Sequence, residues 1–169
     1  LPVVPTKRQV TVFKTYAKNE KILPGLFLPS GLYIFHEGQG VFTVGKSFPD
    51  DYIGVDDFNW DKKKFEEMVW LELAEYIPEF EQLKIMRGWA GLYEVNTLDG
   101  NAILGEWPEL KGFYLANGFS GHGFQHCHGV GRYIAELILG KTPVLDLAIF
   151  SPQRVLDNKP VFESKRKII

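Results

Sequence analysis

The 169-residue sequence is poor in the features that mark several broad protein classes. It has one cysteine, Cys127, so no disulfide framework can form within the chain, and a reducing compartment is favoured. No run of about 18 apolar residues is present, which predicts no transmembrane segment. Lys and Arg number 19 against 21 for Asp and Glu, and this near balance gives no basis for binding nucleic acid or an anionic membrane.

The composition is otherwise that of a globular protein large enough for one domain. Aromatic residues make up 14% of the chain, a share that suits either a well-filled core or a pocket for a flat ligand. The chain opens with Leu1-Pro2-Val3, without an initiator methionine or a signal peptide. We therefore expect a fragment of a longer protein.

The first half of the sequence predicts a small antiparallel sheet followed by a helix. Short β-type runs, separated by turns that contain glycine or proline, indicate an antiparallel meander. The helix has a 3.6-residue apolar pattern, with Asp61 as its cap and Pro78 beyond its end. The predicted strands are Gln9–Thr15, Leu26–Leu28, Leu32–Phe35 and Val41–Gly45, and the predicted helix is Asp61–Tyr76.

The second half predicts a long strand, two short strands and one further helix. The strands are expected over Lys84–Val95, Ala102–Leu104 and Phe113–Ala116, and the helix over His128–Leu139. Gly140 suits the end of that helix. Its predicted apolar face contains Val130, Ile134, Leu137 and Ile138. The fold class is therefore α+β, with a mixed, mainly antiparallel sheet.

A glycine-rich loop, Asn117–Gly123, precedes the second helix. Glycines permit close approach of a ligand and a left-handed backbone, and a helix start offers unpaired N–H groups to an anion or a polarised carbonyl. We place Gly129 and Gly131 in the first turn of that helix. The alternative is a tight strand-to-helix turn without a ligand. The loop lacks the Lys-Ser/Thr of nucleoside-triphosphate loops and the spacing of the dinucleotide fingerprint.

Histidine and cysteine residues gather just beyond this loop. His122, His126, Cys127 and His128 could suggest a zinc or iron site, or a cysteine nucleophile. The side chains of consecutive residues diverge, and the sequence holds no second ligand cluster and no marked base for Cys127. We therefore predict no metal site, with His122 facing a ligand and the other residues serving local packing or lying on the surface.

An ordered series of motifs resembles the C-terminal part of the D-amino-acid oxidase superfamily, in particular monomeric sarcosine oxidases and the FAD-dependent oxidoreductase domain-containing proteins linked to assembly of mitochondrial respiratory complex I. The resemblance covers nearly the whole chain. The motifs are Trp89-Ala90-Gly91-Leu92-Tyr93, Asn96 to Gly105, Gly118-Phe119-Ser120-Gly121-His122-Gly123 and Gly129-Val130-Gly131.

The resemblance implies a two-domain flavoenzyme. Residues 1–98 would form the substrate domain, residues 99–158 would return to the FAD-binding domain, and residues 159–169 would be a tail. The N-terminal dinucleotide-binding half would lie upstream. The loop and the residues after it would lie beside the flavin ring: Gly118, Phe119, Ser120, Gly121, His122, Gly123, Phe124 and Gln125.

Further positions in this sequence match functional positions of the family. Tyr33, Tyr93 and Gln125 would face the substrate, Gln125 in place of a lysine that meets its carboxylate. Gly91 stands where sarcosine oxidases hold FAD through a cysteine, which implies non-covalent FAD. Thr43 stands where oxidases carry a lysine that favours electron transfer to O2. Lys46 would point to the opposite face of that strand.

The resemblance implies oxidation of a secondary amine or an N-substituted amino acid by hydride transfer to FAD. Its partners would be a small amine or amino-acid substrate and an unidentified electron acceptor, with a dehydrogenase favoured over an oxidase. The alternative is a non-catalytic flavoprotein that serves as an assembly factor and binds another protein. A bacterial protein of this kind would be cytoplasmic and a eukaryotic one mitochondrial.

Overall fold

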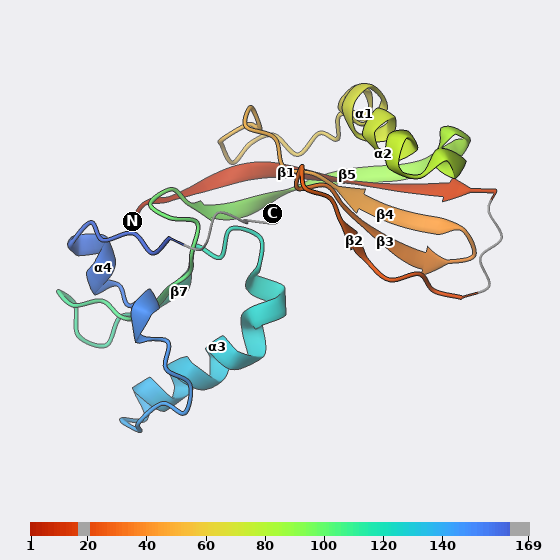
Figure 1. The fold of residues 1–169 in the computed structure, drawn as a ribbon. Helices are drawn as coiled ribbons and strands as arrows, with labels where there is room; N and C mark the ends of the chain where they lie inside the picture. Colours follow the sequence, from red (N-terminus) through yellow and green to blue (C-terminus); the bar gives the residue numbers. More distant parts are fainter. Residues whose placement is uncertain (17–20, 163–169) are drawn as a thin grey trace. The chain divides into compact units, whose positions relative to one another are not determined.

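The computed structural model describes residues 1–16 and 21–162. Five strands form one sheet in the order β2-β3-β4-β1-β5, and β6 and β7 form a separate antiparallel pair (Figure 1). The strands are β1 (Val3–Thr15), β2 (Leu26–Phe27), β3 (Tyr33–Gly38), β4 (Val41–Gly45), β5 (Leu83–Asn96), β6 (Ile103–Glu106) and β7 (Tyr114–Asn117). These strands and the helices below confirm the α+β class.

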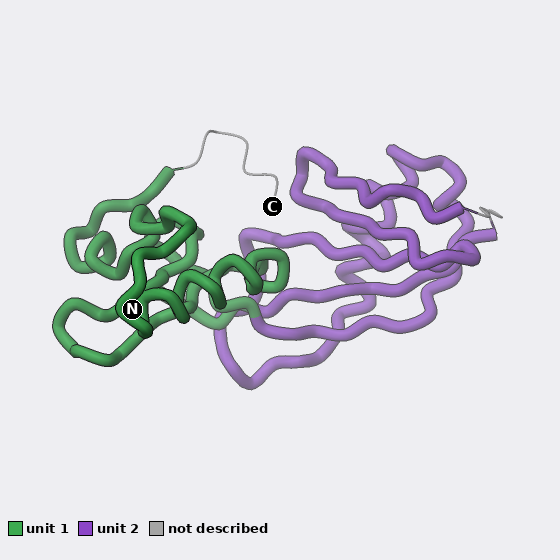
Figure 2. Tube along the Cα trace, turned by 90° about the horizontal axis from the view of Figure 1, so that it is seen from below, with its two compact units in different colours: residues 1–6, 93–165 green, residues 7–92, 166–169 purple. Residues whose placement is uncertain are grey.

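The chain divides into two compact units (Figure 2). One contains Leu1–Thr6 together with the described residues from Tyr93 onward and is called the loop unit below. The other, Lys7–Leu92, is called the sheet unit. The assignment of residues 1–98 to a substrate domain and 99–158 to a flavin domain stays a prediction, and residues 163–169 of the predicted tail lie outside the described part of the chain.

The sheet unit contains the predicted meander. Strand β2 pairs with β3, β3 with β4 and β4 with β1, each pair antiparallel. Gln39 and Gly40 turn the chain between β3 and β4 with φ angles of 52° and 73°. Strand β4 has the predicted bounds, whereas β1 begins six residues before the predicted start. Its early residues Val3 and Val4 carry β-type side chains, but Pro5 interrupts the pattern.

The predicted first helix is present as one continuous helical segment. It consists of α1 (Lys62–Lys64), a π-helical stretch (Phe65–Val69) and α2 (Trp70–Tyr76). The Lys64 N–H donates to Oδ1 of Asp61 at 3.1 Å, so Asp61 is the cap. Pro78 opens a short 3-10 helix, Pro78–Glu81, directly after the end of α2. The cap and the stop are both confirmed.

One face of the sheet packs against this helical segment. The core is aromatic: the Phe13 ring lies 5.6 Å from that of Phe42 and 5.2 Å from that of Phe80. Phe65, Val69 and Leu73 bring the helical segment onto the same cluster. Because side chains alternate across a strand, the neighbours of these residues lie on the other face of the sheet. We call that second face the open face.

The loop unit has a smaller core. Helix α3 (Gly123–Ile138) packs Val130 and Tyr133 against Leu104 of β6. A 3-10 helix (Ala148–Phe150) and α4 (Gln153–Leu156) follow. Gly140 ends α3 with a φ of +65°, as predicted. No helix in the described part of the chain is long and apolar enough to cross a membrane.

Two predictions for the second helix are wrong. The helix begins at Gly123, five residues before the predicted start at His128, so Gly129 and Gly131 do not belong to its first turn. Ile138, predicted on the apolar face, is 57% exposed, whereas Tyr133 is buried. Residues 123–127 contain one large apolar side chain, Phe124, beside glycine and polar residues, so no apolar periodicity marks the start of the helix.

Candidate functional site

The glycine-rich loop connects β7 to α3 through a series of left-handed residues. Gly118 and Gly121 have φ angles of +74° and +99°, and Ser120 has a φ of +51° although it carries a side chain. A non-glycine residue in this region costs about 1 kcal/mol and persists where its surroundings hold it. The conformation of Ser120 therefore needs a structural cause.

Three hydrogen bonds hold the loop to the end of β5. The Phe119 N–H donates to the Glu94 carboxylate at 3.2 Å, and the Ser120 N–H donates to the Glu94 carbonyl at 3.2 Å. The Asn96 N–H donates to the Ser120 hydroxyl at 3.0 Å. Since these bonds fix both Phe119 and Ser120, the loop has a defined conformation within its own unit. They also engage the N–H groups of these two residues inside the chain.

The Phe119 side chain anchors the loop from below. Its ring packs with the apolar cluster of β6 and α3, and a Cβ added at Gly123 would lie 3.3 Å from the ring's Cγ. The sequence predicts Phe119 beside the flavin. The structure shows that its ring belongs to the core of the loop unit, so its contribution to a site is to hold the backbone of its neighbours.

Tyr93 lies directly against the loop. A Cβ added at Gly121 would overlap the Tyr93 ring, and Gly121 also has a left-handed φ, so both constraints demand glycine here. The structure thus brings the predicted substrate-facing residue Tyr93 together with the predicted flavin-facing loop. Gly121 is the position where the close approach is tightest.

The first turn of α3 supplies backbone donors. His122 is the residue before the helix and makes no side-chain cap, and the first turn holds no acidic residue. The N–H groups of Gly123, Phe124 and Gln125 lack carbonyl partners within the helix, and the helix dipole makes this end positive. Phe124 is 89% exposed and Gln125 is exposed as well. This turn can receive an anion or a polarised carbonyl oxygen.

The histidines near the loop do not gather into a metal cluster with other described residues. The His122 and His126 rings stack with centroids 6.1 Å apart, and Cys127 Sγ lies 3.4 Å from Nδ1 of His128. Among the residues that the structure describes, no group of three or more His, Cys, Asp or Glu side chains could hold a metal ion. Cys127 and His128 are both exposed, and within residues 1–16 and 21–162 no third side chain forms a hydrogen bond with this pair.

Tyr33 belongs to the sheet unit, where it lies on the open face in an aromatic group. Its ring centroid is 6.5 Å from that of Phe27 and 5.9 Å from that of Phe35. A Cβ at Gly45, its partner on β4, would overlap the Tyr33 hydroxyl. Gly45 thus lets the Tyr33 ring lie over β4. A joint role of Tyr33 with Tyr93 stays a prediction.

Thr43 and Lys46 lie as the strand geometry predicts. Thr43 on β4 pairs with Val12 on β1 and with Phe35 on β3, and its side chain belongs to the open face. Lys46 pairs with Glu72 of α2 at 2.5 Å and therefore belongs to the helix side of the sheet. Thr43 thus stays a neutral residue on the open face, and the nearby lysine is already engaged on the other side.

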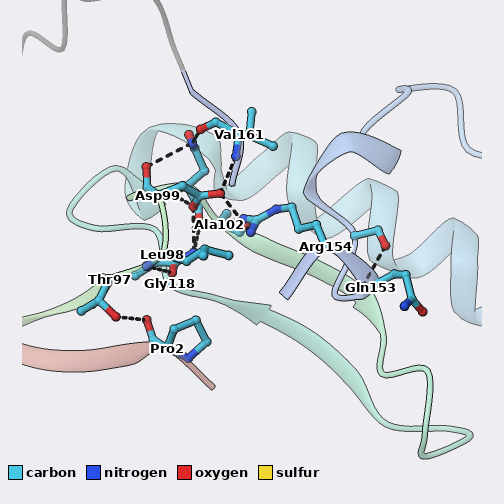
Figure 3. A network of polar contacts seen from close by, with 12 residues as sticks. Pro2, Thr97, Leu98, Asp99, Ala102, Gly118, Gln153, Arg154 and Val161 are labelled. Carbon is cyan, nitrogen blue, oxygen red and sulfur yellow. Dashed lines mark hydrogen bonds and ion pairs between the residues drawn. The ribbon is translucent and has the colours of Figure 1, made fainter. Parts of the chain in front are cut away.

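A buried polar network beneath the loop was not predicted from the sequence (Figure 3). Nδ2 of Asn96 donates to Asp99 Oδ1 at 3.0 Å and to the Asn101 carbonyl at 2.6 Å, while its Oδ1 accepts from the Leu98 N–H. The Asp99 side chain is fully buried and also accepts from the N–H groups of Asn101 and Val161 at 2.9 Å.

Arg154 closes this network from α4. Its Nη1 lies 3.1 Å from Asp99 Oδ2, and its Nη2 donates to the carbonyls of Asn101 and Ala102 at 3.1 and 2.7 Å. Burial lowers the pKa of the Arg154 guanidinium, and the charge of Asp99 opposes that shift. Its contacts span 52 to 55 residues of sequence, and for that reason no local pattern reveals them.

Known proteins resemble this chain throughout most of its length. A family model described as "FAD dependent oxidoreductase" (DAO) matches residues 1–137. The FAD-dependent oxidoreductase domain-containing protein 1 of Xenopus laevis is 40% identical over 96% of the chain, and the monomeric sarcosine oxidase of Bacillus sp. (strain B-0618) is 28% identical over 91%. The L-proline dehydrogenase structure from P.horikoshii superposes with a TM-score of 0.82 at 29% identity over 95% of the chain.

These proteins are longer than the chain. The matches cover 33% of the Xenopus protein, 42% of the sarcosine oxidase and 42% of the proline dehydrogenase chain. The chain thus spans well under half the length of each. The activity of each of these longer proteins therefore also depends on residues that have no counterpart in these 169.

Proposed function

Because the chain belongs to the DAO family of FAD-dependent oxidoreductases, we propose that it is the flavin-facing and substrate-facing part of an enzyme that oxidises a secondary amine or an N-substituted amino acid. The observation that carries this proposal is the left-handed loop, Gly118–His122, which is held to β5, lies against Tyr93 and leads into the open end of α3. When bound, FAD accepts the hydride that the carbon next to the amine nitrogen loses.

The residues of the loop fit a flavin. A Cβ at Gly121 would overlap the Tyr93 ring, so glycine at this position already lets one flat ring lie against the loop backbone, and we propose that the flavin ring approaches backbone of the same loop. The first turn of α3 adds N–H donors at Gly123, Phe124 and Gln125. Fixed donors stabilise negative charge without having to reorganise, which is the electrostatic demand that a reduced flavin makes on its surroundings.

The chain itself contributes to substrate binding through aromatic rings and one amide. Tyr93, beside the loop, and Tyr33, on the open face of the sheet unit, each match a family position that faces the substrate, and an aromatic ring at such a position would exclude water from a small amine. The Gln125 side chain on α3 can donate a hydrogen bond to a substrate carboxylate but carries no charge. We therefore expect weaker carboxylate binding than a lysine would give, unless an arginine from beyond this chain contributes.

The names of two similar proteins support this substrate class. Sarcosine and proline are both amino acids with a secondary amine, and they are named as substrates of an oxidase and a dehydrogenase respectively. The neutral Thr43 favours a dehydrogenase here, because a cation near the flavin would assist the first electron transfer to O2, which forms an anion.

A flavin spectrum of the full-length protein tests the proposal. Anaerobic addition of sarcosine or L-proline should bleach the visible flavin absorbance, while glycine betaine, whose quaternary nitrogen has no lone pair to assist hydride loss from the adjacent carbon, serves as the comparison compound. A tightly bound flavin that stays oxidised with all secondary amines tested would contradict the enzyme proposal.

The second candidate is a non-catalytic flavoprotein that acts as an assembly factor for a respiratory complex. The Xenopus laevis relative at 40% identity supports it, since the name of that protein states a cofactor and no substrate. Such a protein would be mitochondrial in a eukaryote, whereas a bacterial enzyme would be cytoplasmic. Co-purification of a stable protein partner together with a bound flavin that no amine reduces would favour this candidate.

A further inference from the structure

The conformation of Ser120 points to a requirement beyond a simple turn. Glycine would adopt its φ of +51° at no cost, yet the chain has a serine there. Its hydroxyl accepts from the Asn96 N–H at 3.0 Å and lies 3.4 Å from the Gly118 carbonyl, to which it donates. The side chain thus ties the loop to the end of β5, which a glycine could not do.

The end of β5 is in turn fixed by buried polar contacts. All the hydrogen-bonding groups of the Asn96 side chain are used, on Leu98, Asp99 and Asn101. Asp99 divides its two oxygens between two tasks. Oδ1 accepts from Asn96 and Asn101, whereas Oδ2 accepts from Val161 and faces Arg154.

Oδ2 of Asp99 therefore contacts a segment that lies far away in sequence, Arg154 to Val161. The Asp99–Arg154 pair is 93% buried or more on both sides, and Arg154 also holds the carbonyls of Asn101 and Ala102. A continuous path of contacts leads from α4 and Val161 through Asp99 and Asn96 to Ser120, all of it within the loop unit. Each step is a hydrogen bond or an ion pair, and Figure 3 shows the contacts that join Asp99 to Arg154 and Val161.

We infer that Asp99 and Arg154 are positioning residues for the flavin-facing loop: the segment from Arg154 to Val161 acts as a clasp that sets the conformation of Ser120 and its neighbours. This inference rests on the proposed function for its consequence at the flavin. A buried charge that loses its partner is strongly destabilised, so the clasp can transmit a change in the C-terminal segment to the loop. Neither residue needs to touch the flavin or the substrate.

Asp99→Asn isolates the clasp. The asparagine keeps an oxygen for Asn96 and Asn101, but its amide nitrogen replaces Oδ2 and presents donors to the donors of Val161 and Arg154. In the full-length holoprotein, amide hydrogen exchange at Phe119 and Ser120 should become about tenfold faster or more, the factor that follows from losing one charged hydrogen bond. The midpoint potential of the bound flavin should shift as well, because its neighbouring donors have moved.

Thr97→Val is the matched control. Thr97 lies in the same turn, but its hydroxyl donates to the Pro2 carbonyl at 3.1 Å and, among the described residues, forms no hydrogen bond with Asn96, Asp99 or Ser120. In the Thr97→Val variant, the rates of amide hydrogen exchange at Phe119 and Ser120 and the midpoint potential of the flavin should equal those of the unmodified protein. Equal acceleration in Thr97→Val and Asp99→Asn would show general loosening of the turn and overturn the inference.

Arg154→Lys gives a milder second variant if Asp99→Asn does not fold. Lysine keeps the charge beside Asp99 but cannot hold both carbonyls, so we expect a smaller acceleration at the same two amides. Faster exchange confined to residues 153–162, with Phe119 and Ser120 unchanged, would overturn the inference. If the full-length protein binds no flavin, the proposed function fails, while the exchange at these amides still decides whether the clasp positions the loop.

Discussion

The two units of the chain are stabilised in different ways. The sheet unit depends on aromatic packing, with Phe13 at the centre of a cluster between the sheet and the helical segment. The loop unit has a small apolar core and a buried network around Asp99 and Arg154. Apolar packing accepts many arrangements of similar volume, whereas a buried polar network is stable only when each group has its partner. The difference suits a broad aromatic surface in one unit and a defined loop in the other.

The largest expected effect concerns how the cofactor is attached. Neither unit has a thiol at the position that sarcosine oxidases use: the sheet unit has Gly91, and Cys127 lies exposed on α3. Acid precipitation of the full-length protein should therefore release all of its flavin into the supernatant. A Cβ at Gly91 meets no atom within 4 Å, so Gly91→Cys is tolerated sterically and provides a comparison. Flavin that stays in the pellet of the unmodified protein would contradict non-covalent binding.

Truncation of the aromatic core tests whether the sheet unit is an independent cooperative unit. Phe13→Ala should lower the free energy of opening of β3 and β4 by about 4 kcal/mol, since it removes a fully buried ring. Native-state hydrogen exchange should show this loss in the sheet unit and little change in β6 and β7. Lys14→Ala, at an exposed neighbouring position, should change the free energy of opening of β3 and β4 by less than about 0.5 kcal/mol. Equal loss in both units would show that they do not open separately.

Loss of the buried cation tests the loop unit in the same way. Arg154→Met leaves Asp99 without its charge partner and should cost about 3 kcal/mol of local stability around β6 and β7. The control is Arg132→Met, which removes an exposed pair with Glu136 on α3 and should cost less than about 0.5 kcal/mol. A cost for Arg154→Met no greater than that of the control would mean that the polar network does not stabilise this unit.

A charge on the open face of the sheet tests the reaction with oxygen. The unmodified full-length enzyme should reoxidise slowly in air after reduction, and Thr43→Lys should accelerate this step about tenfold, because about 1.4 kcal/mol of stabilisation corresponds to that factor. Lys46→Gln alters charge on the helix side and should leave the rate unchanged. Stopped-flow absorbance measures the rate, and rapid reoxidation of the unmodified enzyme with stoichiometric peroxide would refute the dehydrogenase proposal.

The smallest expected effect is the pH response of a partly buried ion pair in the sheet unit. The Lys7 hydrogen bond at 2.7 Å holds the pKa of Asp57 below its ordinary value. A depressed carboxyl pKa stabilises the fold above the unfolded-state pKa, and the contribution disappears as pH falls through the folded pKa. Asp57→Asn should therefore slightly flatten the acid side of the melting-temperature profile. An NMR titration of Asp57 without a depressed midpoint would contradict the pairing in solution.

Local sequence signals predicted most of the sheet unit. Alternation of side chains and the turn at Gly38-Gln39-Gly40 gave the meander, and Asp61 and Pro78 gave both ends of the helical segment. These features depend on residues close together in the chain. Thr43 and Lys46 were placed on opposite sides of β4 by the same period-two geometry.

The loop unit was less predictable because its determinants are distant in sequence. The Asp99–Val161 hydrogen bond joins residues 62 positions apart, and the overlap of Gly121 with Tyr93 depends on tertiary contact. The first turn of α3 lacks both a capping side chain and apolar periodicity, so its start was placed too late. The resemblance to a family predicts that the loop is a site, whereas the polar network beneath it required the structure.

FAD binding by two glycine variants tests the central claim most directly. Gly121→Ala adds a Cβ that must displace the Tyr93 ring or the loop, whereas Gly131→Ala adds one on α3 where no atom lies within 4 Å. The dissociation constant of FAD, measured by titration of the full-length apoprotein, should rise at least about tenfold in Gly121→Ala, the factor for about 1.4 kcal/mol. It should stay unchanged in Gly131→Ala. Equal and unaltered FAD binding by both variants would contradict the account of this loop as the flavin-facing site.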